Sequence, residues 1–364
     1  MGQVAHYSGI SGRLFNAAHK FIGHLPGGLA MATIGACAFF AAICGSTTAT
    51  SATMATVALP QMKKFNYDPA LATGVVAAGG TLGILIPPST IFIIYGIMTE
   101  QSVGKLFVAG VLPGILLAAL FALVILVWSR LQPGLCALAP KASWREKFAS
   151  LAGVIETIAL FFIVMGGLFI GLFTPTEAAV VAVFYALVCG KWVYRTLQWK
   201  AVPAIAARSA MLTSSVLLVM ATSAAFAWVL TVEGIPQYLS QLIVSWELSP
   251  VMFLVAVNVL LLVFGIFMEP LPGVMILVPI LAPIASALGI DPTHFAMVVI
   301  VNLTLGMITP PVGGLLFVTA VSTRVSITAL TREMPPFLLA HFVVLALLTF
   351  VPQLSTWLPH SLGF

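Results

Sequence analysis

Two pairs of adjacent prolines lie inside long apolar segments of this sequence, and glycine and hydroxyl residues stand beside each pair. The first pair lies near the end of the phrase GGTLGILIPPS (79–89), and the second lies in the phrase NLTLGMITPPV (302–312). Proline has no N–H and disfavours the helical conformation of the residue before it, so each pair should interrupt a helix. The interruption frees carbonyl oxygens, which are the ligands that hard cations prefer. Each phrase therefore predicts a site for a small cation such as sodium.

The glycine and oxygen-bearing residues nearest the two interruptions are the candidate cation ligands. In the first half they are Ser46, Thr81, Gly83 and Ser89. In the second half they are Glu269, Thr304, Gly306 and Thr309. The alternative for the hydroxyls is that they bond back to their own helix or pack at small interfaces. A carboxylate within an apolar segment is costly and usually functional, but the alternative for Glu269 is a place at the outer interface.

A second kind of chemistry is suggested by the stretch 45–51, GSTTATS, which interrupts another apolar run. It is rich in hydroxyls and carries no charge, which suits hydrogen bonding to a carboxylate or hydroxyl of a solute. Broken helices also present N-terminal ends that favour anions and C-terminal ends that favour cations. One site can therefore hold both an organic anion and sodium. Glu177, which follows Pro175, is expected to cap a helix rather than to bind a ligand.

Composition places these residues in a membrane protein. Hydrophobic residues make up 61% of the 364 residues and charged residues only 7%. The apolar segments are longer than barrel strands and do not alternate, so an all-α polytopic membrane protein is predicted. The basic residues do not gather on one surface, which argues against a nucleic-acid partner. No Ser-His-Asp arrangement, transition-metal cluster or phosphate loop is evident, so the sequence does not predict an enzyme.

Nine apolar runs provide the helices that must position the site. They are 27–60, 70–98, 107–129, 152–173, 176–194, 209–231, 251–288, 293–321 and 336–357. The runs 27–60 and 251–288 are too long for one crossing and are interrupted by polar or proline residues. Each is either two full helices or a re-entrant helical hairpin, and the hairpin is favoured because a polar tip is tolerated in a cavity lined by protein.

The chain contains a repeat. Pro87 and Pro310 lie 223 positions apart, and the same offset relates Pro60 to Pro283 and Pro113 to Pro336. We therefore expect a first repeat at 1–130 (hairpin 27–60, broken helix 70–98, helix 107–129). A cytoplasmic linker at 131–151 precedes a second repeat at 152–364. The second repeat contains scaffold helices at 152–231, a hairpin at 251–288, a broken helix at 293–321 and a helix at 336–357.

Basic residues predict that the two repeats are inverted. If the segment before residue 27 is cytoplasmic, every Lys and Arg except Lys105 falls inside. Lys63 and Lys64 lie inside, whereas the corresponding stretch before Asp291 lies outside and has no basic residue, as in carriers with a mid-membrane site between inverted repeats. The C-terminus is then periplasmic. The run 152–231 has no counterpart before Met1, so we expect two or three N-terminal helices to be missing.

Several motifs together resemble one family. They are GSTTAT (45–50), VALPQM (57–62), YDP (67–69), FTPTEA (173–178) and the two proline phrases. In combination they are similar to the DctM-like large membrane subunit of TRAP transporters, the tripartite ATP-independent periplasmic carriers of bacteria and archaea. The resemblance implies an elevator-type fold in the inner membrane and sodium-coupled import of an organic anion, such as a C4-dicarboxylate or a sugar acid. It also implies two partners, a Q-type small membrane subunit and a P-type periplasmic binding protein.

The resemblance also implies further residues at the site. It adds Gly80 to the first sodium site and implies that five residues contact the solute. These are Thr47, Thr48, Pro88, Pro270 and Pro311. The resemblance implies no cofactor other than the coupling sodium. It also implies that the outer surface of the protein contacts membrane lipid. Two alternatives stay open, namely a stand-alone divalent-anion/sodium symporter and a truncated subunit that does not transport.

Overall fold

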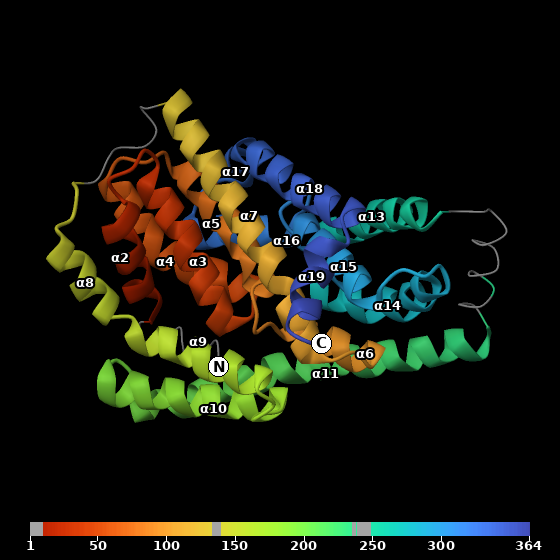
Figure 1. The fold of residues 1–364 in the computed structure, drawn as a ribbon. Coiled ribbons are helices and arrows are strands. Elements are labelled where there is room, and N and C mark those ends of the chain that lie inside the picture. The colour runs from red at the N-terminus through yellow and green to blue at the C-terminus, as the bar shows by residue number, and fades with distance from the viewer. Residues whose placement is uncertain (1–9, 133–139, 235–237, 239–248) are drawn as a thin grey trace.

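A computed structural model of the chain describes residues 10–132, 140–234, 238 and 249–364. This part of the chain is helical and has no strand (Figure 1), which confirms the prediction of an all-α protein. Six helices in it are long and apolar enough to cross a membrane, and nine are if each bent helix pair counts as one span. The chain is therefore a multi-pass membrane protein.

The first half is a helical hairpin followed by a broken helix. Its helices are α2 (Ile10–Ile22), α3 (Gly28–Cys44), α4 (Thr47–Lys64), α5 (Pro69–Leu85), α6 (Thr90–Thr99) and α7 (Val103–Leu131). Gly45 ends α3 with φ +62°, a left-handed conformation that favours glycine. The Asp68 carboxylate caps α5 by accepting from the backbone N–H groups of Ala70 and Leu71. Local residues thus explain both features: Gly45 ends the first arm of the hairpin, and Asp68 caps the start of the broken helix.

The second half repeats this plan. Its helices are α13 (Pro250–Phe267), α14 (Pro270–Ala287), α15 (Pro292–Gly306), α16 (Gly314–Thr323), α17 (Ile327–Glu333), α18 (Pro335–Phe350) and α19 (Gln353–Ser361). Asp291 caps α15 as Asp68 caps α5. The predicted single helix 336–357 is wrong, because α18 and α19 are bent by 66° at their junction. Pro352 there cannot donate the N–H that would continue the helix.

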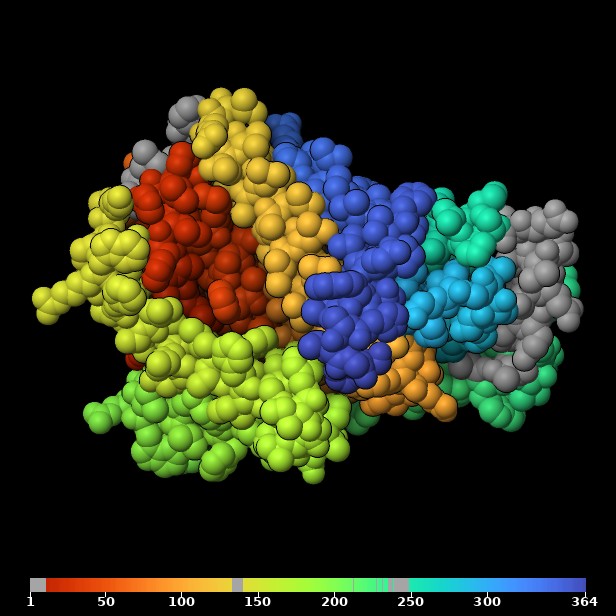
Figure 2. All heavy atoms as spheres, in the orientation of Figure 1, coloured from red at the N-terminus to blue at the C-terminus, as the bar shows by residue number. Residues whose placement is uncertain are grey.

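A layer of helices, which lies between the two halves in the sequence, runs down the left end and along the lower edge of the molecule in this view (Figures 1 and 2). It consists of α8 (Trp144–Ala152), α9 (Ile155–Phe169), α10 (Pro175–Val188) with the π-helical turn Cys189–Val193, and α11 (Val202–Val232). Residues 133–139 of the predicted linker and 235–237 lie outside the described residues. Glu177 forms the predicted cap, because Thr174 and Glu177 exchange side-chain and backbone hydrogen bonds at the start of α10.

Contacts between the halves show how the repeat is arranged. The 223-residue offset carries α4 onto α14 with the same bounds and carries α6 onto α16 within one residue. Helix α4 packs against α16, and α14 packs against α6. The second contact is the first with each helix replaced by its counterpart in the other half. A two-fold relation between the halves requires this packing.

The two broken helices form the centre of the molecule. Every residue of α5 from Leu71 to Leu85 is buried, and so is every residue of α15 from Thr293 to Gly306. A helix that is apolar on all sides is stable only when it is surrounded. Here the hairpin arms pack on α5 and α15, and α7 and α18 pack on them as well. The helices that lead into the interruptions are therefore enclosed by protein rather than exposed to lipid, as unsatisfied backbone groups require.

Two backbones approach closely at Gly306, where a larger residue would strain the core. A Cβ on Gly306 of α15 would overlap the backbone of Gly265 on α13. We expect Gly306→Ala to lower the stability of the purified chain by about 1–3 kcal/mol through overpacking. Gly35→Ala is the control, because Gly35 lies on α3 and a Cβ there meets no atom within 4 Å. Equal thermal unfolding midpoints for the two variants would contradict the expectation.

Candidate functional site

In the first half the hairpin tip lies directly on the helix break. A Cβ built on Gly83 would be 2.5 Å from the carbonyl oxygen of Ser46 and 2.8 Å from the Cα of Thr47. On the other side of the tip, a Cβ on Gly45 would be 3.0 Å from the carbonyl oxygen of Pro88. Glycine at positions 45 and 83 thus lets the tip and the break touch through their backbones.

Four helix ends meet at this junction. The C-terminal ends of α3 and α5 lie there with the N-terminal ends of α4 and α6. Helix C-termini carry partial negative charge and N-termini partial positive charge. Since Lys, Arg, Asp and Glu are absent from both 45–51 and 79–89, backbone dipoles and hydroxyls dominate the local field. The arrangement can stabilise a cation and an anion side by side.

Ser89 is the predicted residue whose structure best fits a ligand role. It precedes α6, and its hydroxyl makes no capping hydrogen bond. The residue is 1% exposed, and its Oγ has no hydrogen-bond partner among the described residues. A buried hydroxyl without a partner costs free energy, and native structures usually satisfy it. A bound cation would provide that interaction.

Two carbonyls beside the break also lack their helical donors. In a continuous helix the carbonyls of Gly83 and Ile84 would accept from residues 87 and 88, which are prolines without an N–H. Ile86 N–H donates to Leu82 and is the last helical donor before the prolines. No other backbone N–H of the described residues reaches these two oxygens. They are ready acceptors for a cation or water.

The remaining predicted residues of the first half have different surroundings. Thr81 Oγ1 donates to the Ala78 carbonyl at 2.6 Å, which is the back-bonding alternative. Gly80 packs against Ser51, with a virtual Cβ 2.9 Å from the Ser51 Cβ. Ser46 caps α4 by accepting from Ala49 N–H, and its hydroxyl lies 3.2 Å from that of Thr48. Gly80 and Thr81 are therefore placed for packing, a turn away from the tip.

The predicted solute residues of the first half lie at the tip and the break. Thr47 is buried at the first position of α4, while Thr48 and Pro88 are half-buried. Thr90 follows Ser89, is exposed, and donates its hydroxyl to the Gly45 carbonyl at 3.4 Å. The structure thus brings Ser46, Thr47, Gly83 and Ser89 together around one junction.

The second half has the same junction with its carbonyls already occupied. Gly313 N–H donates to the Ile266 carbonyl at 3.1 Å, which ties the break to the hairpin tip. Thr309 N–H donates to Gly306 and Leu315 N–H to Met307, each at 3.0 Å. The prolines at 310 and 311 would have left these two carbonyls without donors. The second break is therefore more nearly satisfied by the chain than the first.

The predicted ligands of the second half do not converge on one point. Thr304 and Thr309 bond back to their own chain, at 2.7–2.8 Å to the carbonyls of Ile300, Val301 and Leu305. Glu269 precedes α14 at the tip, where it is exposed and makes no side-chain capping bond. Pro270 is buried and Pro311 is exposed. Of these predicted residues, Gly306 is the one that approaches the first arm of the hairpin directly through its backbone, at Gly265.

One polar contact that the residue patterns did not predict joins the halves. Ser51 Oγ on α4 lies 2.8 Å from Thr319 Oγ1 on α16, and both side chains are buried. Ser51 belongs to the hydroxyl-rich stretch, but nothing in the spacing of Thr319 identifies it as a partner. The pair lies beside Gly80 and fastens the first hairpin to the second broken helix.

A polar chain within the second half was also missed. Asn302 on α15 donates to the carboxamide oxygen of Asn258 on α13 at 2.8 Å, and Asn258 donates to Thr349 Oγ1 on α18 at 2.8 Å. An asparagine in the apolar run 251–267 was the available signal for this chain. Hydrogen bonds between membrane helices fix their register.

Among the described residues no group of three or more His, Cys, Asp or Glu side chains lies together as a metal site would need. The oxygens at the two junctions come from carbonyls and hydroxyls, which suit a hard monovalent cation.

The family model of the DctM component of the tripartite ATP-independent periplasmic (TRAP) transporters matches residues 1–354.

This chain belongs to that family. The TRAP family consists of membrane transporter subunits, so the chain is a transport protein and not an enzyme. The resemblance seen in the motifs is therefore confirmed.

Two curated relatives show how far the similarity extends. The chain is 42% identical over 357 residues to the C4-dicarboxylate TRAP transporter large permease protein DctM of Pseudomonas aeruginosa, covering 98% of this chain and 83% of the relative. It is 37% identical over 354 residues to the isethionate TRAP transporter permease protein DctMQ of Oleidesulfovibrio alaskensis, covering 95% of this chain and 54% of the relative.

A solved structure supports the fold. The crystal structure of the YdaH transporter of Alcanivorax borkumensis, described as having an unusual topology, matches with a TM-score of 0.56 and 14% identity. The match covers 99% of this chain and 85% of that chain. At this identity the similarity shows the fold alone.

The asparagine chain of this TRAP subunit leads to a stability prediction. We expect Asn302→Ala and Asn258→Ala each to destabilise the protein, with a coupling free energy of about 0.6–1.7 kcal/mol in the double-mutant cycle, as for other hydrogen bonds between membrane helices. Equilibrium unfolding of the purified chain measures it. Thr222→Ala is the control, because its hydroxyl is on the exposed helix α11 and bonds within that helix. Strictly additive losses would contradict the expectation.

Proposed function

We propose that this chain is the large transmembrane subunit of a sodium-coupled TRAP transporter that imports an organic anion. The single observation that carries the proposal is the first junction, where two helix C-termini, two helix N-termini and the unpartnered Ser89 hydroxyl meet. The junction places oxygen ligands for sodium directly beside the positive helix ends that would attract a carboxylate.

The first sodium ion is assigned to the break in α5 and α6. Its ligands are the Ser89 hydroxyl and the carbonyls of Gly83 and Ile84, with Ser46 at the adjoining tip. The second ion is assigned to the break between α15 and α16, where Glu269 contributes charge from the tip. The carbonyls of Gly306 and Met307 already accept hydrogen bonds. The second ion therefore depends mainly on the side chains of Glu269 and Thr309, whereas the first ion also has free carbonyls as ligands.

The solute is assigned to the N-terminal ends of α4 and α14, at Thr47, Thr48, Pro88, Pro270 and Pro311. Thr47 and Thr48 provide hydroxyls and backbone N–H groups at a positive helix end, and the three prolines shape the surface beside them without a fixed cation. Organic anions of more than one chemical class are named for relatives, a C4-dicarboxylate for one and isethionate for another. We infer a carboxylate or a similar small organic anion as the solute here.

Movement is assigned to the two hairpins and two broken helices as one body. The packing of α4 on α16 and of α14 on α6 joins them, and the Ser51 to Thr319 hydrogen bond adds a polar link. Helix α11 is largely exposed along its length and belongs to the surrounding frame. An elevator motion would carry the joined body past that frame in the inner membrane, with the C-terminus in the periplasm.

The transporter works with two partners in this proposal. The relative named DctMQ combines the large permease with a Q component, which supports a small membrane subunit beside this chain. A periplasmic binding protein delivers the solute. Reconstitution in proteoliposomes with both partners tests the proposal: uptake should require a sodium gradient and the binding protein. Sodium-driven uptake by the chain alone would support a stand-alone symporter instead, and no uptake with both partners would overturn the proposal.

Ser89→Ala tests the first sodium site. Loss of an oxygen ligand to a cation should raise the sodium concentration for half-maximal uptake by about tenfold or more, by analogy with hydrogen bonds to charged groups. Thr73→Ala is the matched control, since Thr73 lies near the other end of α5 and its hydroxyl bonds back to Pro69 at 2.7 Å. An equal effect of both substitutions would show that the loss is structural.

Glu269→Gln tests the second site. We expect weaker sodium dependence with retained solute recognition, because an amide attracts a cation less than a carboxylate does. The exposed position limits the expected rise in half-maximal sodium concentration to about fivefold. An unchanged sodium activation curve would remove Glu269 from the site and leave it as a residue of the outer interface.

A further inference from the structure

A cleft of about 480 Å³ lies between α2, α4 and the segment 140–142, apart from both junctions. Gly12, Asn16 and Lys20 line it from α2, and Gln61 and Lys64 line it from α4. The cleft contains no acidic side chain among its lining residues. It is therefore a basic site that the transport proposal does not use.

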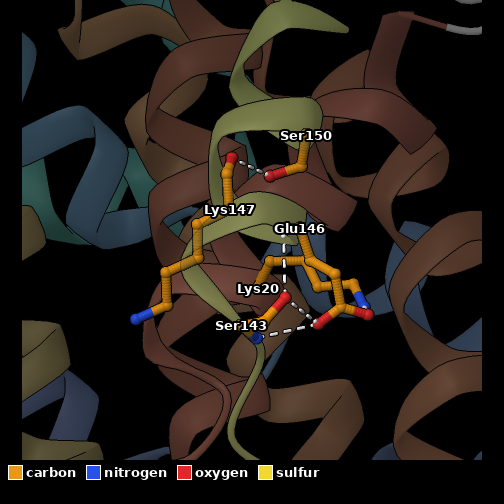
Figure 3. A network of polar contacts seen from close by, with 5 residues as sticks. All are labelled: Lys20, Ser143, Glu146, Lys147 and Ser150. Carbon is orange, nitrogen blue, oxygen red and sulfur yellow. Dashed lines mark hydrogen bonds and ion pairs between the residues drawn. The ribbon is translucent and has the colours of Figure 1, made fainter.

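The two lysines of the cleft differ in their partners. Lys20 Nζ lies 3.3 Å from Glu146 Oε1 on α8, and Glu146 is itself held by the Ser143 backbone N–H at 2.8 Å (Figure 3). Lys64 is exposed at the last position of α4 and forms no salt bridge in the described part of the chain. The cleft thus has one compensated and one uncompensated positive charge, and it can accept an anion.

Aromatic side chains give the cleft an apolar wall. The His19 ring stacks on Phe15, with centroids 6.1 Å apart, and meets Phe65 edge-on at 5.9 Å. Burial, with a smaller contribution from Lys20, lowers the pKa of His19, so the imidazole is neutral at pH 7 and contributes a hydrogen bond rather than charge. A ligand with a charged head and an apolar portion fits this lining.

The neighbouring helix indicates that the cleft lies at the membrane surface. Trp144 and Phe148 of α8 are 69% and 63% exposed, and the exposed Arg145 lies between them in the sequence. Lys147 lies 4.8 Å from the Trp144 ring and 5.7 Å from the Phe21 ring of α2. Exposed aromatics mixed with basic residues are typical of helices at the interface of lipid and water. Anionic phospholipid headgroups are concentrated there.

We propose that the cleft between α2 and α4 binds a phosphate group, that of an anionic phospholipid, with Lys64 and Lys20 on the phosphate and the half-buried Phe65 against the first apolar atoms of the lipid. Inorganic phosphate has the same charged group without the apolar part. The two sources differ in whether the aromatic wall contributes to affinity.

Two substitutions separate the site from general surface charge. Lys64→Gln removes the uncompensated charge, and Lys63→Gln is the control, because the neighbouring Lys63 is also exposed but does not line the cleft. Gly12→Leu places a bulky apolar side chain in the cleft without changing charge. A Cβ at Gly12 meets no atom within 4 Å, so the helix tolerates it, and Gly12→Ala controls for folding.

The measurement is binding of phosphatidylglycerol to the purified full chain, counted by native mass spectrometry, with phosphatidylcholine of the same chain length and inorganic phosphate as comparison probes. We expect saturable phosphatidylglycerol binding that weakens about fivefold in Lys64→Gln, from the contribution of one lysine near an anionic surface. Binding should be lost in Gly12→Leu and unchanged in Lys63→Gln and Gly12→Ala.

The competing outcomes are distinct. Inorganic phosphate that binds as tightly as phosphatidylglycerol, with the same dependence on Lys64, supports a phosphate site whose natural ligand is soluble. Equal losses in Lys64→Gln and Lys63→Gln overturn the proposal, because surface charge alone would then explain binding. Full binding by Gly12→Leu, or equal binding of phosphatidylcholine, overturns it as well.

Discussion

The structure depends on one constraint, namely that backbone groups freed inside a buried helix must find partners. Both proline pairs remove donors from helices that are enclosed on all sides. In the second half the chain supplies donors itself, from Thr309 and Leu315. In the first half the carbonyls of Gly83 and Ile84 have no such donor, and Ser89 adds an unpartnered hydroxyl. The two breaks share a sequence pattern but differ in what they leave for a ligand.

Glycine makes the breaks usable as sites. Gly83 lets the first hairpin tip rest on α5, and Gly306 with Gly265 lets α15 approach the first arm of the hairpin in the second half. Helix ends are brought close enough for their dipoles to act on one ligand, although Lys, Arg, Asp and Glu are absent from both 45–51 and 79–89. Charge is instead concentrated near α2 and α8, at the edge of the molecule. Backbone dipoles thus dominate the electrostatic field at the first junction, and ionised side chains dominate it near α2 and α8.

Much of the architecture could be predicted from residue types alone. Apolar length predicts helices, adjacent prolines predict the breaks, and the predicted runs 70–98 and 293–321 begin within one residue of the helix starts at Pro69 and Pro292. These are local effects, set by missing N–H groups and by capping within a few residues. The single helix expected at 336–357 is wrong, because the chain bends by 66° between α18 and α19, where Pro352 has no N–H to continue the helix.

The sequence by itself determined the membrane class, the family and the positions of the two interruptions, because each follows from composition or from short-range backbone chemistry. Only the tertiary structure decided which hydroxyls are free. Thr81, Thr304 and Ser89 are all hydroxyl residues near a proline pair in the sequence. The first two donate to carbonyls of their own helix, whereas Ser89 does not. It also decided that Ser51 meets Thr319 across 268 residues. Such contacts depend on how distant helices pack, and no spacing along the chain encodes them.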